Sequence, residues 1–377
     1  MTSSVPALSV LTSEALDRAL SLRDLSDPQH GPHAMQQLVA AIHEALTERW
    51  ACRRLLHRAN PLVSVQDNYD RLGYPADGAA RDARYTRYIT PNILLRSQTS
   101  AMIPNLLRTL ALDPPEDVLL ICPGLVYRRD TIDRLHIGEP HQLDLWRIKR
   151  GPLSSHDLAE MARTVVATAL PGHRYRLIPS RHPYTAIGMQ IDAAVGDDWV
   201  EIGECGMAAP HVLADAGLDT TAVTGLAMGL GLDRLLMLRK GVDDIRLLRS
   251  EDPRIARQML DLRPYMPVSD QPPITRDLSV AVTADLESEE IGAAIREALG
   301  EDSERLESVA VLAETLYEDL PPAAHARMGI RPGQKNILLR LVIRDPVRTL
   351  TRPEANAIRD RVYAAVHDGD RLELAAC

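Results

Sequence analysis

The sequence predicts an α+β protein with one large core and a smaller second core. A chain of 377 residues, of which 45% are apolar, is long enough to bury both. An apolar strand, a charged loop and a returning strand follow one another between Val118 and Ile148. Strands and helices then follow through residues 274–370 in an order typical of a separate sandwich domain.

The strongest helical pattern in the chain lies between His33 and His57. Six apolar residues recur there at helical spacing on one face: Met35, Leu38, Val39, Ile42, Ala45 and Leu46. This spacing is typical of a helix that packs one face against a core. Before it, residues 1–30 predict an appendage with one short helix. After it, residues 60–92 are rich in Gly, Pro, Asn and Asp and predict loops.

The central hairpin carries a charge-dense loop. Its first strand joins the apolar run Val118–Cys122 to the alternating stretch Gly124–Arg128, and its second strand is Gln142–Ile148. The loop between them holds Arg129, Asp130, Asp133, Arg134, His136 and Glu139. Because arginine offers phosphate oxygens a planar fork of donors, the loop suits a polyanion. An ordinary solvated hairpin loop fits the same pattern.

Beyond the hairpin, the pattern predicts a helix at 153–170, then short strands and a Gly-rich strand that runs into a helix. The short strands are 174–179, 189–195 and 199–203. A linker with four prolines covers residues 261–273. The C-terminal part then predicts strand 277–282, helix 289–299, strands 308–317 and 336–343, and helix 353–365. That βαββαβ-like order is typical of a ferredoxin-like sandwich.

Composition restricts the class of protein. No apolar run approaches the roughly 20 residues that span a bilayer, and the N-terminus predicts no signal or transit peptide. We therefore expect a cytoplasmic protein with no membrane partner. The four cysteines form no CxxC pair, which indicates reduced thiols. The net charge of −9 argues against non-specific coating of nucleic acid, and the chain contains no phenylalanine.

One basic stretch interrupts this acidic chain. From Arg327 to Arg361, nine Arg and Lys residues stand against three Asp and Glu residues. Such a local excess suits a surface that follows a phosphate backbone. A solvated helix and strand edge would give the same composition.

Several segments resemble the motifs of class II aminoacyl-tRNA synthetases, in the version found in phenylalanyl-tRNA synthetase. VYRRD (126–130) with PHQLDLW (140–146) resembles motif 2, and LLRSQTS (94–100) resembles the segment before it. The remaining matches are HGPHAMQQLVAAIHEAL for the motif 1 helix, WVEIGECGMAAPHVLADAGLD for the strand before motif 3, and GLAMGLGLDRLLMLRKGVDDIRLL for motif 3. An ordered set over about 220 residues is far more specific than one motif.

The resemblance continues into the C-terminal part, where PPITRDLSVAV and RTLTRPEANAIRDRVYAAV are similar to the anticodon-binding domain of that family. It implies a class II antiparallel sheet flanked by helices, plus a C-terminal ferredoxin-like α/β sandwich. The implied domains are an appendage (1–30), the catalytic domain (31–260), a linker (261–273) and the anticodon-binding-like domain (274–377). This single-chain layout resembles the organellar enzyme and implies a monomer or homodimer without an obligatory second subunit.

The resemblance also implies the binding of ATP and Mg²⁺. Arg128, at the end of the first motif 2 strand, would hold the α-phosphate, and Arg234, at the start of the motif 3 helix, would hold the γ-phosphate. Glu201 matches a family carboxylate near the metal, where Mg²⁺ needs hard oxygen ligands. The reaction brings a carboxylate to a phosphate, so catalysis is mostly positioning and charge neutralisation.

The implied amino-acid site has two parts. Acceptors for the α-ammonium group match at Gln98, Ser100, Gln142 and Asp144, the last an Asp where the family usually has Glu. The side-chain pocket matches at His182 and Tyr184, in place of a Phe-Pro-Phe segment, and at Leu226, Ala227 and Met228, in place of Phe-Ala-Phe. Glu204 stands where the family usually has an apolar residue. With His182 it either faces the pocket and favours a more polar ring, or forms a pair outside it.

Contacts with tRNA are expected at Arg340, Arg344, Arg348 and Arg352 in the basic stretch. The family's His-Pro-x-Arg element is replaced by PADGAARD, in which Arg81 corresponds to the family's arginine. The predicted function is ATP-dependent activation of phenylalanine or an analogue and its transfer to tRNA. Two alternatives stay open: a paralogue that adenylates a different amino acid for a non-tRNA acceptor, and a non-catalytic regulator that binds tRNA or an amino acid.

Overall fold

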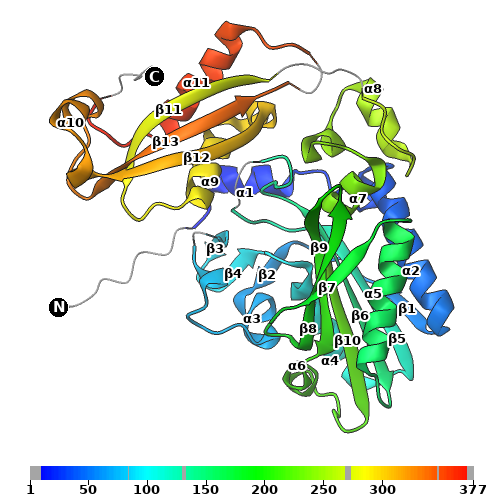
Figure 1. Ribbon diagram of the computed structural model, residues 1–377. Coiled ribbons are helices and arrows are strands. Elements are labelled where there is room, and N and C mark those ends of the chain that lie inside the picture. The colour runs from blue at the N-terminus through cyan, green and yellow to red at the C-terminus, as the bar shows by residue number, and fades with distance from the viewer. Residues whose placement is uncertain (1–9, 84, 130–132, 268–272, 346–347, 372–377) are drawn as a thin grey trace, which may run out of the picture. The chain divides into compact units, whose positions relative to one another are not determined.

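The computed structural model describes residues 10–83, 85–129, 133–267, 273–345 and 348–371. It divides into two compact units (Figure 1). The first contains residues 1–128, 139–242 and 258–265, and the second contains residues 129–138, 243–257 and 266–377. None of the described helices is both long and apolar enough to cross a membrane.

A seven-stranded sheet forms the centre of the first unit (Figure 1). Its order is β1-β5-β6-β10-β9-β8-β7, and every pairing is antiparallel except that of β1 with β5. The strands are β1 (Arg53–Leu56), β5 (Asp117–Leu125), β6 (His141–Arg150), β7 (Tyr175–Pro179), β8 (Thr185–Val195), β9 (Asp198–Ala208) and β10 (Val223–Gly231). The predicted antiparallel sheet of an α+β fold is confirmed.

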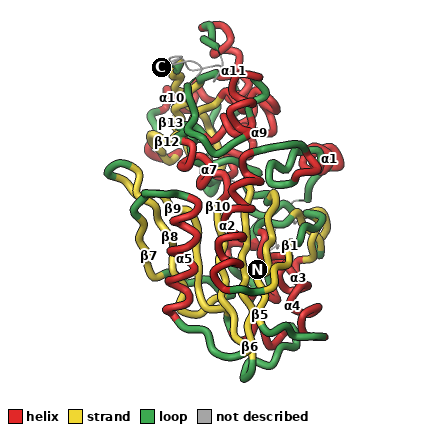
Figure 2. The backbone as a smooth tube through the Cα atoms, turned by 90° about the vertical axis from the view of Figure 1, so that its right-hand side faces the viewer, coloured by secondary structure: helices red, strands yellow, loops and turns green. Residues whose placement is uncertain are grey.

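Helices cover both faces of this sheet. Figures 1 and 2 show α2 (Ala34–Trp50) and α5 (Ser155–Ala169) side by side on one face, with α7 (Leu232–Lys240) near them. On the other face, α4 (Ile103–Leu112) and α6 (Pro210–Asp215) pack on Trp146, Ile148 and Ala227. The predicted helix at 33–57 is shorter in the structure. It ends at Trp50, because Ala51 takes a left-handed conformation and the next residues form the edge strand β1.

The stretch predicted as loops contains a small sheet of its own. Strands β2 (Leu62–Ser64), β4 (Ile93–Leu95) and β3 (Tyr88–Thr90) pair antiparallel, and the short helix α3 (Val65–Asn68) follows β2. The N-terminal helix α1 (Ser13–Leu20) is capped by Thr12, and its Ala19 is buried in one cluster with Leu95, Leu125 and Tyr127. The predicted appendage therefore packs on the first unit through α1.

The C-terminal part of the second unit is a three-stranded antiparallel sheet with two helices. Its strands β11 (Ile274–Thr283), β12 (Leu306–Leu316) and β13 (Gln334–Ile343) lie in the order β11-β13-β12. Helices α9 (Ser288–Leu299) and α11 (Arg352–Val366) share its core, and a short α10 (Pro322–Met328) precedes β13. This is the strand order of a ferredoxin-like sandwich. A closing strand would follow α11, where residues 372–377 lie outside the described part.

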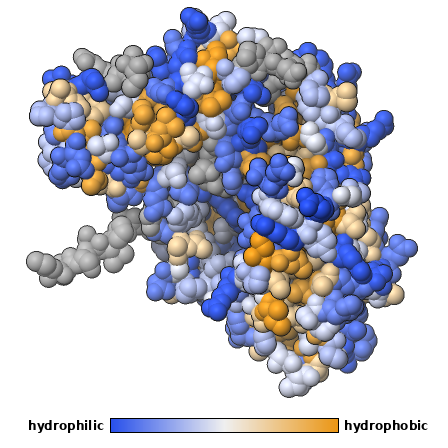
Figure 3. All heavy atoms as spheres, viewed as in Figure 1, coloured by the Kyte–Doolittle hydropathy of each residue, from blue (hydrophilic) through white to orange (hydrophobic). Residues whose placement is uncertain are grey.

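Strand β12 leaves apolar side chains exposed in this unit. Val311, Leu312 and Leu316 are each more than a third accessible, and Figure 3 shows apolar surface over the three-stranded sheet. The cysteines Cys52, Cys122 and Cys205 are free thiols, as expected, and Cys377 lies outside the described residues.

Candidate active site

One row of residues crosses three neighbouring strands of the large sheet. Gly229 of β10 pairs with Asp144 of β6 on one side and with Glu204 of β9 on the other. Directly opposed residues project to the same face of a sheet, so the two carboxyl groups flank the glycine. A Cβ built on Gly229 would lie 3.8 Å from Glu204 Cγ, 3.9 Å from Tyr184 Oη and 4.0 Å from Asp144 Oδ2. The glycine therefore adds no side chain of its own between the two acids.

The next row on the same face is apolar. Ala227 pairs with Trp146 on β6 and with Gly206 on β9. Trp146, Ala227 and Tyr184 are buried in one cluster, and the Trp146 and Tyr184 rings stack with centroids 6.0 Å apart. Small residues on β10 and β9 thus lie beside an aromatic wall, an arrangement that suits a flat apolar group.

Asp144 is a fully buried acid with three donors. Its Oδ1 accepts from Ser100 Oγ (2.9 Å) and Trp146 Nε1 (3.1 Å), and its Oδ2 accepts from Thr99 Oγ1 (2.7 Å). Burial raises the pKa of Asp144 to about 6, and the charge of Glu204 adds to the rise, while the three donors oppose it. A cation bound beside this carboxylate would replace the hydration that burial removes.

The two glutamines hold the segment that carries Thr99 and Ser100. The side-chain oxygen of Gln142 accepts from the Thr99 backbone N–H at 3.2 Å. Gln98 accepts from the Tyr74 hydroxyl at 2.9 Å and donates to the carbonyl of Asn68 at 2.8 Å. The structure therefore brings together the four residues expected at the α-ammonium group.

Glu204 is held by two donors on the same face. One of its oxygens accepts from the Tyr184 hydroxyl, and the other lies 2.6 Å from His182 Nδ1. The second ring nitrogen of His182 lies 3.1 Å from Ser180 Oγ. Burial and the charge of Glu204 raise the pKa of Tyr184 well above its ordinary value, so its hydroxyl stays a donor. A quarter of the Glu204 side chain is exposed.

Leu226 and Met228 do not reach this face. Because side chains alternate along a strand, the neighbours of Ala227 project to the opposite side of the sheet. There Leu226 pairs with Arg147 and Met207, and both Leu226 and Met228 are fully buried. The structure therefore separates these two expected pocket residues from Ala227, and they do not line the face that carries Asp144 and Glu204.

Arg128 lies directly beyond β5 at the edge of the site. Its Nε donates to the carbonyl of Ser97 at 2.7 Å, which ties it to the segment of Gln98 and Ser100. Its own carbonyl accepts from Arg87 Nη2 at 2.9 Å. The positive charge of Arg128 also acts on Tyr74, whose pKa burial raises and Arg128 partly lowers. The guanidinium therefore lies beside the segment whose Thr99 and Ser100 hold Asp144.

Arg234 and Glu201 lie together at the start of α7. Arg234 Nη1 donates to the backbone carbonyl of Glu201 at 3.1 Å, and the Glu201 residue is exposed on β9. No group of three or more His, Cys, Asp or Glu side chains able to hold a metal occurs among the described residues. A magnesium ion is commonly held by one or two carboxylates plus phosphate oxygens, so Glu201 fits the ion only together with a bound triphosphate.

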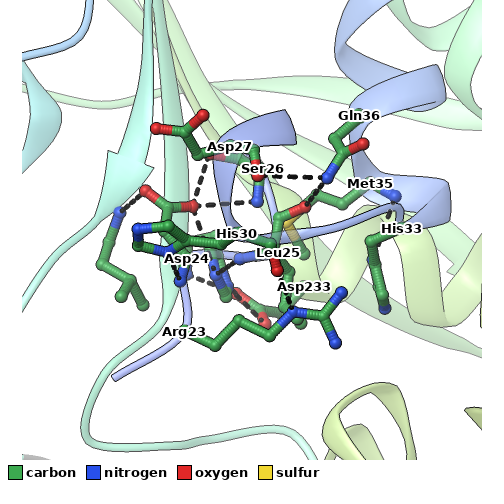
Figure 4. Close-up of polar contacts among 12 residues, drawn as sticks. Arg23, Asp24, Leu25, Ser26, Asp27, His30, His33, Met35, Gln36 and Asp233 are labelled. Atoms are coloured by element: carbon green, nitrogen blue, oxygen red, sulfur yellow. Dashed lines mark hydrogen bonds and ion pairs between the residues drawn. The ribbon is translucent and has the colours of Figure 1, made fainter. Parts of the chain in front are cut away.

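The start of α7 is anchored through a buried histidine. His141 donates its backbone N–H to Asp233, and its Nδ1 lies 3.1 Å from the same carboxylate. Its other ring nitrogen accepts from the Leu25 N–H at 2.9 Å. Figure 4 shows Asp233 beside segment 23–27, where Asp24 accepts from Ser26. Residues 23–27, which belong to the segment predicted as an appendage, thus help to fix the position of α7, the helix that carries Arg234.

Residues 129–138 of the charged hairpin loop belong to the second unit, whereas Glu139 belongs to the first. Asp133 contacts His136 Nδ1 at 2.6 Å, and the carbonyl of Arg134 accepts from the Ile245 N–H at 3.1 Å. The Arg134 side chain lies 4.0 Å from Glu307. Asp130, which was also expected in the loop, lies outside the described residues.

Arg81 supports the loop that carries Tyr74. It forms an ion pair with Asp70 at 2.6 Å and donates to the Tyr74 carbonyl at 2.5 Å. Its guanidinium also lies 5.1 Å from the centre of the Tyr69 ring. Through these contacts Arg81 holds the backbone of the loop at Tyr74.

Three of the four arginines expected to contact tRNA are paired with acids. Arg340 forms two hydrogen bonds of 2.8 Å to Asp277, Arg344 lies 2.8 Å from Glu307, and Arg348 lies 2.7 Å from Glu354. Arg352, by contrast, is exposed and makes no ion pair within the described part of the chain. Most counter-ions come from outside the basic stretch.

Sequence reasoning missed four residues that shape the site: Thr99, Trp146, Tyr74 and Asn68. Two of them could have been identified from the sequence, because Thr99 is part of LLRSQTS and Trp146 follows Asp144 by two positions on a strand. Tyr74 and Asn68 lie in the stretch predicted as loops, where no periodicity marks a functional side chain.

Curated relatives match over part of the chain. The phenylalanine–tRNA ligase alpha subunit of Prochlorococcus marinus strain MIT 9313 is 38% identical over 194 residues, 51% of this chain and 56% of the relative. The same subunit of Lactiplantibacillus plantarum is 32% identical over 264 residues, 66% of this chain and 73% of the relative. The chain thus spans little more than half of the first relative.

Among solved structures, a pyrrolysyl-tRNA synthetase from Desulfitobacterium hafniense is similar at 21% identity with a TM-score of 0.45, covering 60% of this chain and 76% of that one. The family model described as the tRNA synthetases class II core domain (F) matches residues 25–259. That match covers more than half of the sequence and all of the sheet described above. The chain belongs to this family of class II tRNA synthetase core domains.

Proposed function

We propose that this protein activates an aromatic amino acid, phenylalanine or an analogue, with ATP and transfers it to tRNA. The observation that carries the proposal is Asp144, a buried carboxylate held by Thr99 and Ser100 beside the Trp146–Tyr184 wall. Such a site takes an ammonium group at one end and an aromatic ring at the other. Relatives named as phenylalanine–tRNA ligase alpha subunits support it.

The residues divide the work of adenylate formation. Asp144, with Ser100, Gln98 and Gln142 around it, binds and orients the α-ammonium group, which directs the substrate carboxylate toward ATP. That carboxylate attacks the α-phosphorus and diphosphate leaves. Arg128 neutralises the charge that develops at the α-phosphate, and Arg234 binds the γ-phosphate. These phosphate roles rest on the motif positions of the two arginines.

A magnesium ion belongs to the same proposal. Glu201 is exposed beside the contact made by Arg234, so its carboxylate would bind an ion carried by the triphosphate. When bound, the ion supplies positive charge that offsets the charge of the leaving diphosphate. Arg128 and Arg234 bind the triphosphate, and Asp144 binds the amino acid, whether or not the ion is present.

The domain assignment extends the proposal to tRNA. We assign residues 31–260 to catalysis and 274–377 to an anticodon-binding-like domain, joined by 261–273 and preceded by 1–30. We place the protein in the cytoplasm and propose a monomer or homodimer. Because the relatives are named as alpha subunits, the oligomeric state of this chain has to be measured. Light scattering of the purified chain, together with its activity in isolation, tests whether a second subunit is needed.

Two assays test the proposed function. ATP–diphosphate exchange should depend on an aromatic amino acid, and the chain should then charge bulk tRNA. Exchange without charging would favour the paralogue with a non-tRNA acceptor. Binding of an amino acid or tRNA without exchange would favour the regulator, and the proposal would fail.

Arg352 is the candidate tRNA contact that the structure leaves exposed. Arg352→Ala should raise the KM for tRNA about fivefold, because one phosphate contact is lost, and it should leave ATP–diphosphate exchange unchanged. Arg340→Ala is the matched control, and its effect should be smaller because Asp277 already neutralises Arg340. Charging kinetics at two salt concentrations measure both variants. Equal KM values for Arg352→Ala and the unmodified chain would remove Arg352 from the tRNA surface.

A further inference from the structure

The row Asp144–Gly229–Glu204 gives the site a second acid that adenylate chemistry does not need. Asp144 already serves the α-ammonium group in the proposed function. Glu204 projects to the same face from the strand beyond Gly229. Its Cγ, the Tyr184 hydroxyl and Asp144 Oδ2 all lie within 4.0 Å of the point where a Cβ on Gly229 would be. A substrate bound at Asp144 over Gly229 and Ala227 therefore meets Glu204.

Glu204 has capacity for another donor. An ionised carboxylate offers about four lone-pair positions. Two donors occupy Glu204, the Tyr184 hydroxyl and His182 Nδ1. The side chain is 25% exposed, so the remaining positions are open to a ligand. Because Tyr184 is buried and stacked on Trp146, and because His182 contacts Ser180, the acceptor is held in place before the substrate arrives.

A bare phenyl ring is a poor match for this acceptor. It would remove water from Glu204 without supplying a hydrogen bond, and a buried acceptor left unpaired is costly. A ring that carries a hydroxyl, an amino group or a ring N–H would replace the lost water. Sites built around such a hydrogen bond discriminate more strongly than apolar pockets, which separate substrates of nearly equal size only weakly.

We propose that Glu204 determines specificity by accepting a hydrogen bond from the ring of the substrate, so that the chain prefers a donor-bearing aromatic amino acid to phenylalanine. This inference rests on the proposed function, which fixes the ammonium group at Asp144. Tyr184 and His182 act as positioning residues for Glu204. The aromatic wall still supplies the apolar contact that any ring requires.

The test compares substrates of matched size in ATP–diphosphate exchange. 4-Aminophenylalanine and 4-methylphenylalanine have nearly the same volume, but only the first carries a donor. Tyrosine and phenylalanine form a second pair. The full-length chain should show kcat/KM at least about tenfold higher for the donor of each pair, as expected when an unpaired acceptor is avoided. Binding of the same four compounds is followed in parallel by their effect on the thermal unfolding midpoint.

Two variants connect that preference to Glu204. Glu204→Leu removes the acceptor and should reduce each ratio to about one or below. Glu204→Gln keeps an oxygen that accepts from Tyr184 and should give an intermediate ratio. This variant still tests the inference if the leucine variant is poorly folded. Gln190→Ala is the matched control. Gln190 lies opposite Glu204 on β8, but its amide is bonded to Asp192, so the preference should persist.

The outcomes separate this inference from the function beneath it. Equal kcat/KM for 4-aminophenylalanine and 4-methylphenylalanine would overturn the inference and leave the proposed function standing. Ratios unchanged in both Glu204 variants would do the same. If none of the four compounds supports exchange and none shifts the unfolding midpoint, the proposed function fails and the inference fails with it.

Discussion

Replacement of Arg128 by alanine is expected to lower kcat for ATP–diphosphate exchange about 10²–10³-fold. Arg128 Nε donates to the Ser97 carbonyl at 2.7 Å, and this hydrogen bond fixes the orientation of the guanidinium at the edge of the site. Loss of one donor aimed at charge that develops in the transition state costs about 2.7–4 kcal/mol. Because that charge is greatest in the transition state, kcat should fall more than the KM for ATP rises.

Two further variants make the Arg128 result specific. Arg128→Lys keeps the positive charge but loses the planar fork, so its activity should lie between those of the alanine variant and the unmodified chain. Arg129→Ala changes the next residue along the chain and should stay close to full activity. Normal exchange by Arg128→Ala would remove Arg128 from the α-phosphate site. An equal loss in Arg129→Ala would show that the effect is not specific to Arg128.

Asp144→Asn is expected to reduce kcat/KM for the amino acid about 10²–10⁴-fold while it stabilises the folded protein. The substrate ammonium group would lose its buried counter-charge, a loss of about 3–5 kcal/mol. The asparagine itself fits, because its oxygen accepts from Ser100 and Trp146 and its amide donates to Thr99. The variant therefore loses charge without loss of shape.

The stability gain follows from the pKa of Asp144. Burial raises the pKa of this carboxyl to about 6 in the folded protein, against an ordinary value of 3.8. The folded state binds the proton more tightly, so ionisation costs about 3 kcal/mol of folding free energy at pH 7. That cost shrinks as the pH falls from 6 toward 4 and is absent below that range. The unfolding midpoint of Asp144→Asn should thus exceed that of the unmodified chain by more at pH 7 than at pH 5.

Substrate binding should show the opposite dependence on pH. The ammonium group of the amino acid binds the ionised form of Asp144, so the KM should rise as the pH falls through about 6. The asparagine variant should lack this rise. A pH profile of exchange kinetics, with thermal unfolding at the same pH values, measures both effects. The assignment of Asp144 fails if the KM profiles of the two proteins coincide.

Local sequence patterns predicted most helices and strands, but they did not predict where those elements end. The apolar spacing at 33–46 predicted α2, but it carried no sign that the helix stops at Trp50. The left-handed turn at Ala51 and the pairing of Arg53–Leu56 with β5 decide that boundary, and β5 lies more than sixty residues away. Helix ends depend on such distant partners, whereas helix interiors depend on neighbours three and four positions along the chain.

The basic C-terminal stretch shows the limit of counting charges along a chain. Nine cations against three anions between Arg327 and Arg361 predicted a basic surface. The fold brings Asp277 to Arg340, Glu307 to Arg344 and Asp302 to Arg361. These anions come from strand β11, strand β12 and the turn after α9, so the pairing becomes visible only once the sheet is assembled.

The family, the order of most elements and the arginines proposed to bind the phosphates could be predicted from the sequence alone, because each depends on a short segment that keeps its own pattern. Which of those residues share a face depends on how the strands pair in the folded protein. Strand alternation and register bring Asp144, Gly229 and Glu204 into one row and send Leu226 and Met228 to the other side. Whether Glu204 lies outside the pocket or beside the substrate depends on the pairing of β10 with both β6 and β9, which brings Asp144 and Glu204 to the two sides of Gly229. Hydrogen bonds across a sheet, not distance along the chain, set which side chains meet.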